Sequence, residues 1–245
     1  MLRGIYSAAT GMMFQMQQVN TIANNLANVE TNGYKRKELV GSSFGDLLVQ
    51  FTDQAPGTDN VIGTGIKADG IARYETPGNL VQTKNRFNVA IASSGYFLTR
   101  GADGVEKVTR DGDFQLDTNS RLTTRSGDLV LGTDRRPILL TGDLHTMQIA
   151  EDGRISVGEQ PVGQLMVVEP PKIALETQFP LAPPGLPPST NVSIKQGFLE
   201  HSNVNVVTEM VSMMTANRAY GFGQKVISAH DQILQKAAND LGRIS

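Results

Sequence analysis

Both ends of the chain place large apolar side chains seven residues apart. At the N-terminal end these are Ile5, Met12, Val19 and Leu26, and at the C-terminal end they are Val206, Met213, Tyr220, Ile227, Leu234 and Leu241. A sustained seven-residue period is typical of helices that pack along a coiled-coil seam. The sequence therefore predicts a helix at each end, the second of them about 54 Å long at ~1.5 Å per residue if it is unbroken.

The middle of the chain, from about Gly63 to Gln196, is built instead from short β-type runs separated by turn residues. The candidate strands are Asn88–Ala92, Tyr96–Thr99, Glu106–Arg110, Phe114–Asp117, Asp128–Leu131 and Gln164–Val168. Tight turns are predicted at Asp103-Gly104, Asp111-Gly112 and Asp152-Gly153, because glycine accepts a positive φ at no steric cost. Closely spaced short strands of this kind predict an all-β unit.

Two segments read as connectors. Pro170–Pro188 contains seven of the eleven prolines, and proline removes a backbone donor and fixes φ, so this stretch is expected to be extended. Gly41–Gly65 has Phe44, Leu47, Leu48 and Phe51 at helical spacing, which predicts a short helix followed by a loop.

The predicted fold class is therefore α+β: N- and C-terminal heptad helices form a coiled-coil-like domain, and an all-β domain is inserted between them. The expected domains are 1–40 with 200–245 (helical assembly), 41–69 (connecting segment), 70–169 (β domain) and 170–199 (Pro-rich connector). One narrow apolar stripe per helix buries too little surface to order both ends in a monomer. We therefore expect the helices to need each other and neighbouring subunits, so that the ends fold on assembly.

Composition excludes several classes of function. The net charge of −2, from 22 Lys+Arg and 24 Asp+Glu, gives no general attraction to nucleic acid or to an anionic membrane. Without cysteine there is no disulfide framework and no cysteine metal site. No run approaches ~18 apolar residues, so we expect no membrane insertion, and we expect no cleaved signal peptide.

Catalytic and ligand-binding motifs are also missing from the sequence. The three histidines lie in different segments, and no phosphate-binding, dinucleotide-binding, zinc-protease or nucleophile-elbow motif is present, so we expect no enzyme activity and no cofactor. Asp111, Asp113 and Asp117 faintly resemble a calcium loop but fit a β-turn better. The basic clusters Lys35-Arg36-Lys37 and Arg135-Arg136 are interpreted as solvated surface.

Two terminal motifs carry a resemblance to a known family. Ala23-Asn24-Asn25-Leu26-Ala27-Asn28, continuing through Thr31-Asn32-Gly33-Tyr34-Lys35-Arg36, resembles the N-terminal signature of flagellar rod and hook proteins. Gln196-Gly197-Phe198-Leu199-Glu200 followed by Ser202-Asn203-Val204-Asn205 resembles their C-terminal signature. Tyr96-Phe97 and Thr109–Phe114 also match, so the resemblance covers nearly the whole chain.

The motif residues also have a physical interpretation. The amides of Asn24, Asn25 and Asn28 can satisfy the last carbonyls of the first helix or bond to a neighbouring subunit. Ser202-Asn203 is placed to cap the second helix. Gly221 and Gly223 depart from the family pattern and predict either a kink in that helix or a close approach by a neighbour. Ser94 and Ser120 stand where the family often has glycine.

The resemblance implies a structural subunit of the bacterial flagellar basal-body rod, the periplasmic drive shaft, exported by the flagellar apparatus without signal cleavage. Its implied partners are further copies, other rod proteins, the hook protein, the ring bushing and the export apparatus. The opening Arg3-Gly4-Ile5-Tyr6 favours the proximal (FlgF) type, while Phe44–Leu48 and Ile62–Gly65 favour the distal (FlgG) type; the first is preferred. The alternatives are an enzyme or calcium-binding β domain with helical ends, and a non-flagellar coiled-coil scaffold or adhesion protein. The candidate assembly-interface residues are Ile5, Met12, Val19, Asn24, Asn25, Leu26, Asn28, Asn203, Val204, Asn205, Val206, Met213, Tyr220, Ile227 and Leu234.

Overall fold

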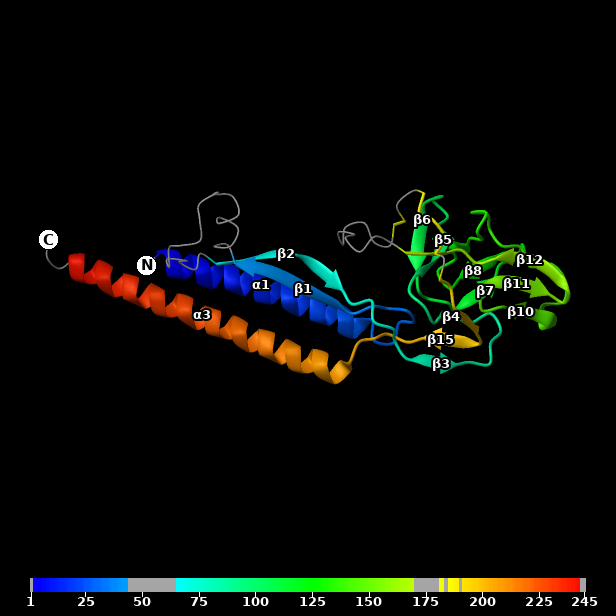
Figure 1. Ribbon diagram of the computed structural model, residues 1–245. Coiled ribbons are helices and arrows are strands. Elements are labelled where there is room, and N and C mark those ends of the chain that lie inside the picture. The colour runs from blue at the N-terminus through cyan, green and yellow to red at the C-terminus, as the bar shows by residue number, and fades with distance from the viewer. Residues whose placement is uncertain (1, 44–64, 170–180, 183–184, 190, 243–245) are drawn as a thin grey trace, which may run out of the picture. The chain divides into compact units, whose positions relative to one another are not determined.

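The computed structural model describes residues 2–43, 65–169, 181–182, 185–189 and 191–242. These residues form an α+β fold with a helix near each end and a β-rich region between them (Figure 1), as the sequence predicts. The chain divides into two compact units. We call residues 1–27, 37–73 and 205–245 the helical unit, and residues 28–36 and 74–204 the β unit.

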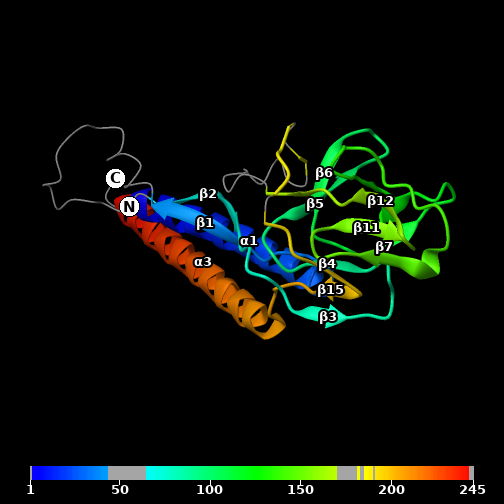
Figure 2. The same ribbon diagram turned by 45° about the vertical axis from the view of Figure 1, so that its right-hand side comes forward.

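The helical unit consists of two long helices and a two-stranded ribbon. Helices α1 (Leu2–Ala27) and α3 (Val206–Gly242) lie side by side and antiparallel (Figures 1 and 2). Strands β1 (Lys37–Ser43) and β2 (Ile66–Arg73) pair antiparallel and pack against α1. The ribbon crosses three of the domains expected from the sequence: β1 spans the boundary between 1–40 and 41–69, and β2 spans the boundary between 41–69 and 70–169. The short helix predicted around Phe44–Phe51 falls outside the described residues.

The start of α3 is set by its capping residue. The Asn205 side-chain Oδ1 accepts a hydrogen bond from the Thr208 backbone N–H at 3.1 Å, and Glu209 places a carboxylate in the first turn, where the helix dipole favours it. The prediction that Ser202-Asn203 caps this helix is therefore wrong. Ser202 Oγ accepts from the Val204 N–H, and Asn203 bonds elsewhere.

Gly221 and Gly223 do not end α3, which continues through both to Gly242. A Cβ at Gly223 would lie 2.4 Å from Met12 Cγ, so this glycine lets α1 approach closely. The close approach that the sequence offered as one explanation is thus made by α1 of the same chain. A Cβ at Gly221 would meet no described atom within 4 Å, and nothing in the structure explains that glycine.

The β unit contains thirteen of the strands that the structure describes, in several small antiparallel sheets. In chain order they are β3 (Leu80–Gln82), β4 (Val89–Ile91), β5 (Tyr96–Arg100), β6 (Glu106–Thr109), β7 (Phe114–Leu116), β8 (Leu122–Thr124), β9 (Leu129–Val130), β10 (Met147–Ile149), β11 (Arg154–Val157), β12 (Gln160–Gln164), β13 (Val167–Val168), β14 (Ile194–Gln196) and β15 (Phe198–Glu200). The largest sheet runs β13-β5-β9-β8-β7 with β6 beside β5. All six predicted strands are confirmed to within two residues at most ends, although β13 is only Val167–Val168.

Strand β15 pairs antiparallel with β3, and β14 pairs antiparallel with β4. Strands β10, β11 and β12 form a separate three-stranded sheet. The inner faces of these sheets bury one large apolar core, in which the Phe97 and Phe114 rings meet edge to face at 5.1 Å between centroids. Tyr96, Leu98 and Met166 belong to a second, smaller apolar cluster. The β unit therefore holds most of the fully buried apolar side chains that the structure describes.

Two of the three predicted Asp-Gly turns are confirmed. Gly104 and Gly153 adopt positive φ values of 79° and 85°, the left-handed conformation that glycine accepts most easily. Asp111-Gly112 does not form a turn of this kind. A Cβ at Gly112 would lie 1.6 Å from the Val89 carbonyl oxygen, so glycine is needed there for close backbone approach and not for a turn.

Most of the proline-rich connector lies outside the described residues. Of the part that is described, Leu181 bridges to Lys107 and Pro188 bridges to Val168. No helix in the described part of the chain offers an apolar stretch long enough to cross a membrane.

Candidate assembly surface

The antiparallel helix pair of the helical unit is defined by three close approaches along its length. Gly4 lies against the His230 ring, Met12 lies against Gly223, and Asn25 bonds to Glu209. The predicted seven-residue positions are half-buried on both helices, except Leu234, which is 40 % exposed. They are Ile5, Met12, Val19 and Leu26 on α1 and Val206, Met213, Tyr220 and Ile227 on α3. The side chain of Leu241 is outside the described part of the structure.

Much of the apolar surface of both helices remains uncovered in the single chain. On α1, Tyr6, Met13 and Met16 are more than half exposed. On α3 the exposed apolar residues are Val207, Met210, Val211, Met214, Phe222, Val226, Ile233 and Leu234, with Val207 the most exposed at 70 %. A contiguous set of exposed apolar side chains on a water-facing helix is typical of a protein–protein contact surface. Most of these residues lie beside the predicted seven-residue positions in sequence and were not among the candidate interface residues.

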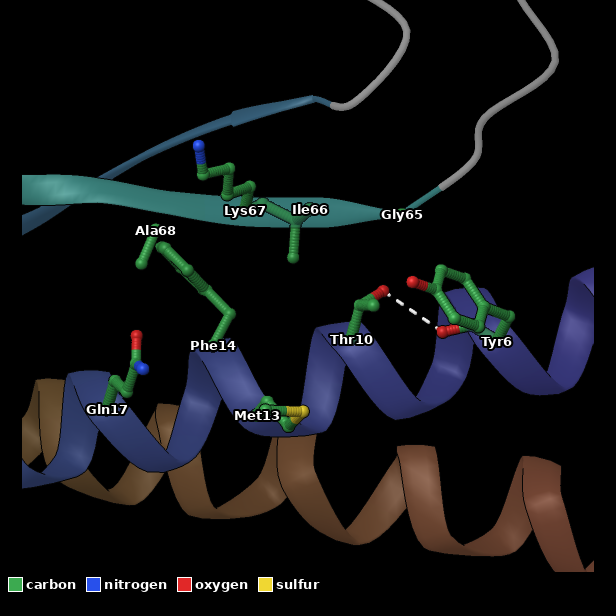
Figure 3. A pocket seen from close by; sticks show the side chains of 9 residues that line it. All are labelled: Tyr6, Thr10, Met13, Phe14, Gln17, Gly65, Ile66, Lys67 and Ala68. Carbon is green, nitrogen blue, oxygen red and sulfur yellow. Dashed lines mark hydrogen bonds between the residues drawn. The ribbon is translucent and has the colours of Figure 1, made fainter.

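A shallow pocket lies between α1 and β2 within the helical unit (Figure 3). Its lining residues are Tyr6, Thr10, Met13, Phe14 and Gln17 from α1 and Gly65, Ile66, Lys67 and Ala68 from the ribbon side. Thr10 Oγ1 donates to the Tyr6 carbonyl at 3.1 Å, and Phe14 points toward the ribbon. Gly41 makes room for that ring, since a Cβ there would lie 2.4 Å from it. The pocket is mostly apolar and continues the exposed Tyr6 and Met13 surface.

The three asparagines of the motif near the end of α1 differ in burial and in hydrogen bonding. Asn25 is 1 % exposed; its Nδ2 donates to the Lys37 carbonyl at 2.8 Å and to Glu209 Oε2 at 3.1 Å, and its Oδ1 accepts from the Lys37 N–H at 3.0 Å. This amide therefore joins α1, β1 and α3 inside one unit. Asn24 is exposed, and Asn28 is half-buried with its Oδ1 accepting from Thr31 Oγ1.

The C-terminal motif lies in the β unit up to Val204, which is buried, while Asn205 is exposed and caps α3. Asn203 Oδ1 accepts from the Arg36 N–H at 2.6 Å. Its Nδ2 donates to the carbonyls of Tyr74 and Thr76 and to the Thr76 hydroxyl, at 2.9 to 3.0 Å. The structure therefore brings Asn203 and the end of the N-terminal motif together within the β unit, although 167 residues separate Asn203 from Arg36 in sequence.

A buried charge network lies close to Asn203 in the same unit. Lys35 Nζ donates to Glu200 Oε1 at 2.6 Å, and Arg110 Nε donates to Glu200 Oε2 at 2.5 Å. All three side chains are almost fully buried. The remaining Arg110 N–H groups donate to the backbone carbonyls of Gly95, Ile91 and Ser93. The interpretation of Lys35 as solvated surface is therefore wrong, because its ammonium group is an internal ion-pair partner.

Burial and hydrogen bonding act in opposite directions on these charges. Burial by itself would raise the pKa of Glu200, but the hydrogen bonds from Arg110, Lys35 and the Gly78 N–H outweigh it and hold that pKa below its ordinary value. The pKa of Lys35 is lowered, first by burial and then by the nearby Arg110 charge, against the opposing hydrogen bond to Glu200. The network is thus a carboxylate held ionised between two cations.

The carboxylates that faintly resembled a calcium loop serve as turn acceptors. Asp111 Oδ1 accepts from the Asp113 N–H, and Asp117 Oδ1 accepts from the Asn119 and Arg121 N–H groups. Burial raises the pKa of Asp111, the largest effect on that group. Among the residues that the structure describes, no group of three or more His, Cys, Asp or Glu side chains is arranged to hold a metal ion.

Sequence comparison matches three parts of the chain to flagellar families. Residues 5–35 match the family described as "Flagella basal body rod protein". Residues 90–157 match "Flagellar hook protein FlgE/F/G D1 domain", and residues 195–241 match "Flagellar basal body rod FlgEFG protein C-terminal". The three matches occur in chain order, and the first and last cover the two terminal motifs except for Arg36.

Complete relatives align with the chain from end to end. The flagellar basal-body rod protein FlgG of Buchnera aphidicola subsp. Acyrthosiphon pisum is 38 % identical over 264 residues, covering 96 % of this chain and 98 % of the relative. FlgG of Agrobacterium fabrum is 32 % identical over 269 residues, covering 98 % and 100 %. The flagellar basal-body rod protein FlgF of Caulobacter vibrioides is 28 % identical over 254 residues, covering 98 % of both. The chain belongs to the flagellar basal-body rod protein family.

Proposed function

We propose that the chain is a structural subunit of the flagellar basal-body rod, and that it polymerises through its helical unit. The observation that carries the proposal is the row of exposed apolar side chains on α1 and α3, including Met13, Val207, Val211 and Phe222. Burying such side chains against a neighbouring subunit lowers the free energy of the assembled state. The similarity to basal-body rod proteins over nearly the whole chain supports another rod subunit as that neighbour.

The finer parts of this proposal follow from family membership. The helices would pack with those of neighbouring copies in a coiled-coil-like manner along the seven-residue positions, in a periplasmic tube that transmits torque to the hook. Other rod proteins, the hook protein, the ring bushing and the export apparatus are the proposed partners, with export that does not cleave a signal peptide. The role is mechanical and needs neither catalysis nor a cofactor.

The type of rod subunit has two candidates. The opening residues Arg3–Tyr6 favour the proximal type named FlgF. Relatives named FlgG, at 38 % and 32 % identity, favour the distal type over the FlgF relative at 28 %. The two types can be distinguished by testing for the chain in basal bodies from which the hook and distal rod have been stripped. Only a proximal subunit is retained there.

The test of assembly makes the same substitution, valine to glutamate, at three exposed valines. Val207→Glu and Val211→Glu place a charge on α3, where we expect an intersubunit contact, whereas Val105→Glu places it on an exposed turn of the β unit. The variants are expressed in a strain lacking the chain, and the chain is quantified in purified basal bodies. We expect the two α3 variants to be lost from basal bodies and Val105→Glu to be retained.

Either of two results overturns the proposal. Wild-type chain that is absent from basal bodies excludes a rod subunit. Incorporation of Val207→Glu and Val211→Glu at the wild-type level excludes this face of α3 as the contact.

A further inference from the structure

The polypeptide passes between its two units four times, after residues 27, 36, 73 and 204. We call the β-unit residues beside these four crossings the passage segments. Three of the four passage segments, those that contain Arg36, Tyr74 and Asn203, are hydrogen-bonded to one another. The Tyr74 N–H donates to the Arg36 carbonyl at 2.9 Å, and the Asn203 N–H donates to the Tyr34 carbonyl at 3.4 Å. Segments that are distant in sequence therefore meet at one place in the β unit.

Asn203 is the side chain that these segments share. Its Oδ1 accepts from Arg36, and its Nδ2 donates to two acceptors on Thr76 and one on Tyr74. Both halves of the amide are thus used, the acceptor on the first segment and the donors on the second. A residue with only acceptors or only donors could not join both.

A second layer of polar contacts anchors this cluster to the core of the β unit. The Gly33 N–H donates to the Glu200 carbonyl at 2.7 Å, and Lys35 Nζ donates to the Thr76 carbonyl at 3.0 Å. Through Glu200 and Arg110 the cluster reaches the backbone carbonyls of Gly95, Ile91 and Ser93. The point where the chain leaves the β unit is therefore fixed to a well-packed body.

We propose that Asn203 is a positioning residue for assembly: it fastens three of the four chain passages to one another, so that the segments of the helical unit start from one fixed place on the β unit before any contact with a neighbouring subunit forms. The proposal rests on the proposed function, because it assigns the fixed place a role in polymerisation. Among the described residues, the side-chain bonds of Asn203 go to Arg36, Tyr74 and Thr76, and these three are not members of the apolar core of the β unit.

Hydrogen exchange of the purified full chain, read by mass spectrometry, tests the first half of the proposal. Asn203→Ala removes every side-chain bond, and Asn203→Asp keeps the acceptor for the Arg36 N–H but loses the donors to Tyr74 and Thr76. We expect peptides that contain Arg36 and Tyr74 to exchange about tenfold faster or more in Asn203→Ala, with no change in β5. Asn203→Asp should keep more of the protection at the Arg36 N–H, which its carboxylate can still accept, than at the Tyr74 N–H.

Asn119→Ala is the matched control. Asn119 lies on an exposed turn of the same unit, where its backbone N–H makes the bond to Asp117. The control should leave exchange of both passage peptides and incorporation into basal bodies unchanged. Incorporation of Asn203→Ala should fall at least about tenfold, while its β5 protection stays that of the wild type.

Three results would overturn the proposal. If the peptides that contain Arg36 and Tyr74 stay protected in Asn203→Ala, the side-chain bonds of Asn203 do not hold these segments together. Loss of protection in β5 as well makes Asn203 a general folding residue. Faster passage exchange with normal incorporation separates the cluster from assembly. Absence of the wild-type chain from basal bodies, by contrast, contradicts the proposed function and leaves the exchange result standing.

Discussion

Replacing Glu200 by glutamine tests how much the buried charge network stabilises the β unit. Glu200 is 2 % exposed and accepts from Lys35 and Arg110 at 2.6 and 2.5 Å. Because Lys35 and Arg110 share this carboxylate, Glu200→Gln leaves two buried positive charges without an anionic partner. Removing one partner of a buried ion pair costs about 3–5 kcal/mol, and a change of this size lowers the Tm of a domain like the β unit by roughly 10–20 °C.

The network also predicts an order among its members. Lys35→Met removes one cation and leaves the Glu200–Arg110 pair neutral, so it should cost only about 1–2 kcal/mol. Urea unfolding followed by tyrosine fluorescence measures both free energies, since the chain has no tryptophan. The reasoning is refuted if Lys35→Met costs as much as Glu200→Gln, or if Glu200→Gln changes the free energy of unfolding by less than about 1 kcal/mol.

The same network sets a dependence of stability on pH. The pKa of Glu200 is lower in the folded chain than its ordinary value of 4.5, so the unfolded state binds more protons as the pH falls below that value. The stability from Glu200 is therefore present above pH 4.5 and is lost as the pH falls through the folded-state pKa. Urea unfolding at a series of acid pH values should show a shallower decline in Glu200→Gln than in the wild type. An equally steep decline would assign the acid sensitivity to other groups.

Two further predictions concern backbone positions. Ser120 has φ 59°, so Ser120→Gly should stabilise the β unit by about 1 kcal/mol in urea unfolding, whereas Arg135→Gly at φ 58° should destabilise it, because Arg135 also pairs with a carboxylate of β6 at 2.7 Å. A stabilised Arg135→Gly would contradict this reasoning. In α3, Gly221→Ala should slow hydrogen exchange of the helix amides in assembled rods, since alanine favours a helix by ~1 kcal/mol over glycine. Gly223→Ala should speed that exchange, because its Cβ would lie 2.4 Å from Met12 Cγ; equal effects of the two alanines would contradict the close packing.

The strands of the β unit were predictable because their signals are local. Tyr96–Thr99 and Glu106–Arg110 combine β-type residues with turn glycines, and the structure places β5 and β6 there. The β1–β2 ribbon was missed, because its partners are separated by a long segment and no turn dipeptide marks the pairing. Register across such a distance depends on tertiary packing, which no short window of sequence contains.

The charge network shows the same limit for the candidate site. Lys35 is followed by Arg36 and Lys37, a run that usually indicates solvated surface. Its partner Glu200 is 165 residues away. The available signal was that Glu200 follows Phe198-Leu199 directly, since a charge within an apolar strand requires an internal partner. That signal indicates a buried carboxylate but does not identify the cation.

The seven-residue pattern predicts that the helices pair, but it cannot by itself fix where they pair. Apolar burial is non-directional, so sliding one helix by seven residues would again place apolar side chains against apolar side chains. Two features of the helical unit oppose such a slide: the Asn25–Glu209 hydrogen bond and the fit of Met12 over Gly223. A shifted pairing would bury the Asn25 amide without its Glu209 acceptor and would set Met12 against a residue with a Cβ. The apolar seam thus supplies the attraction, while one buried amide and one glycine select the register.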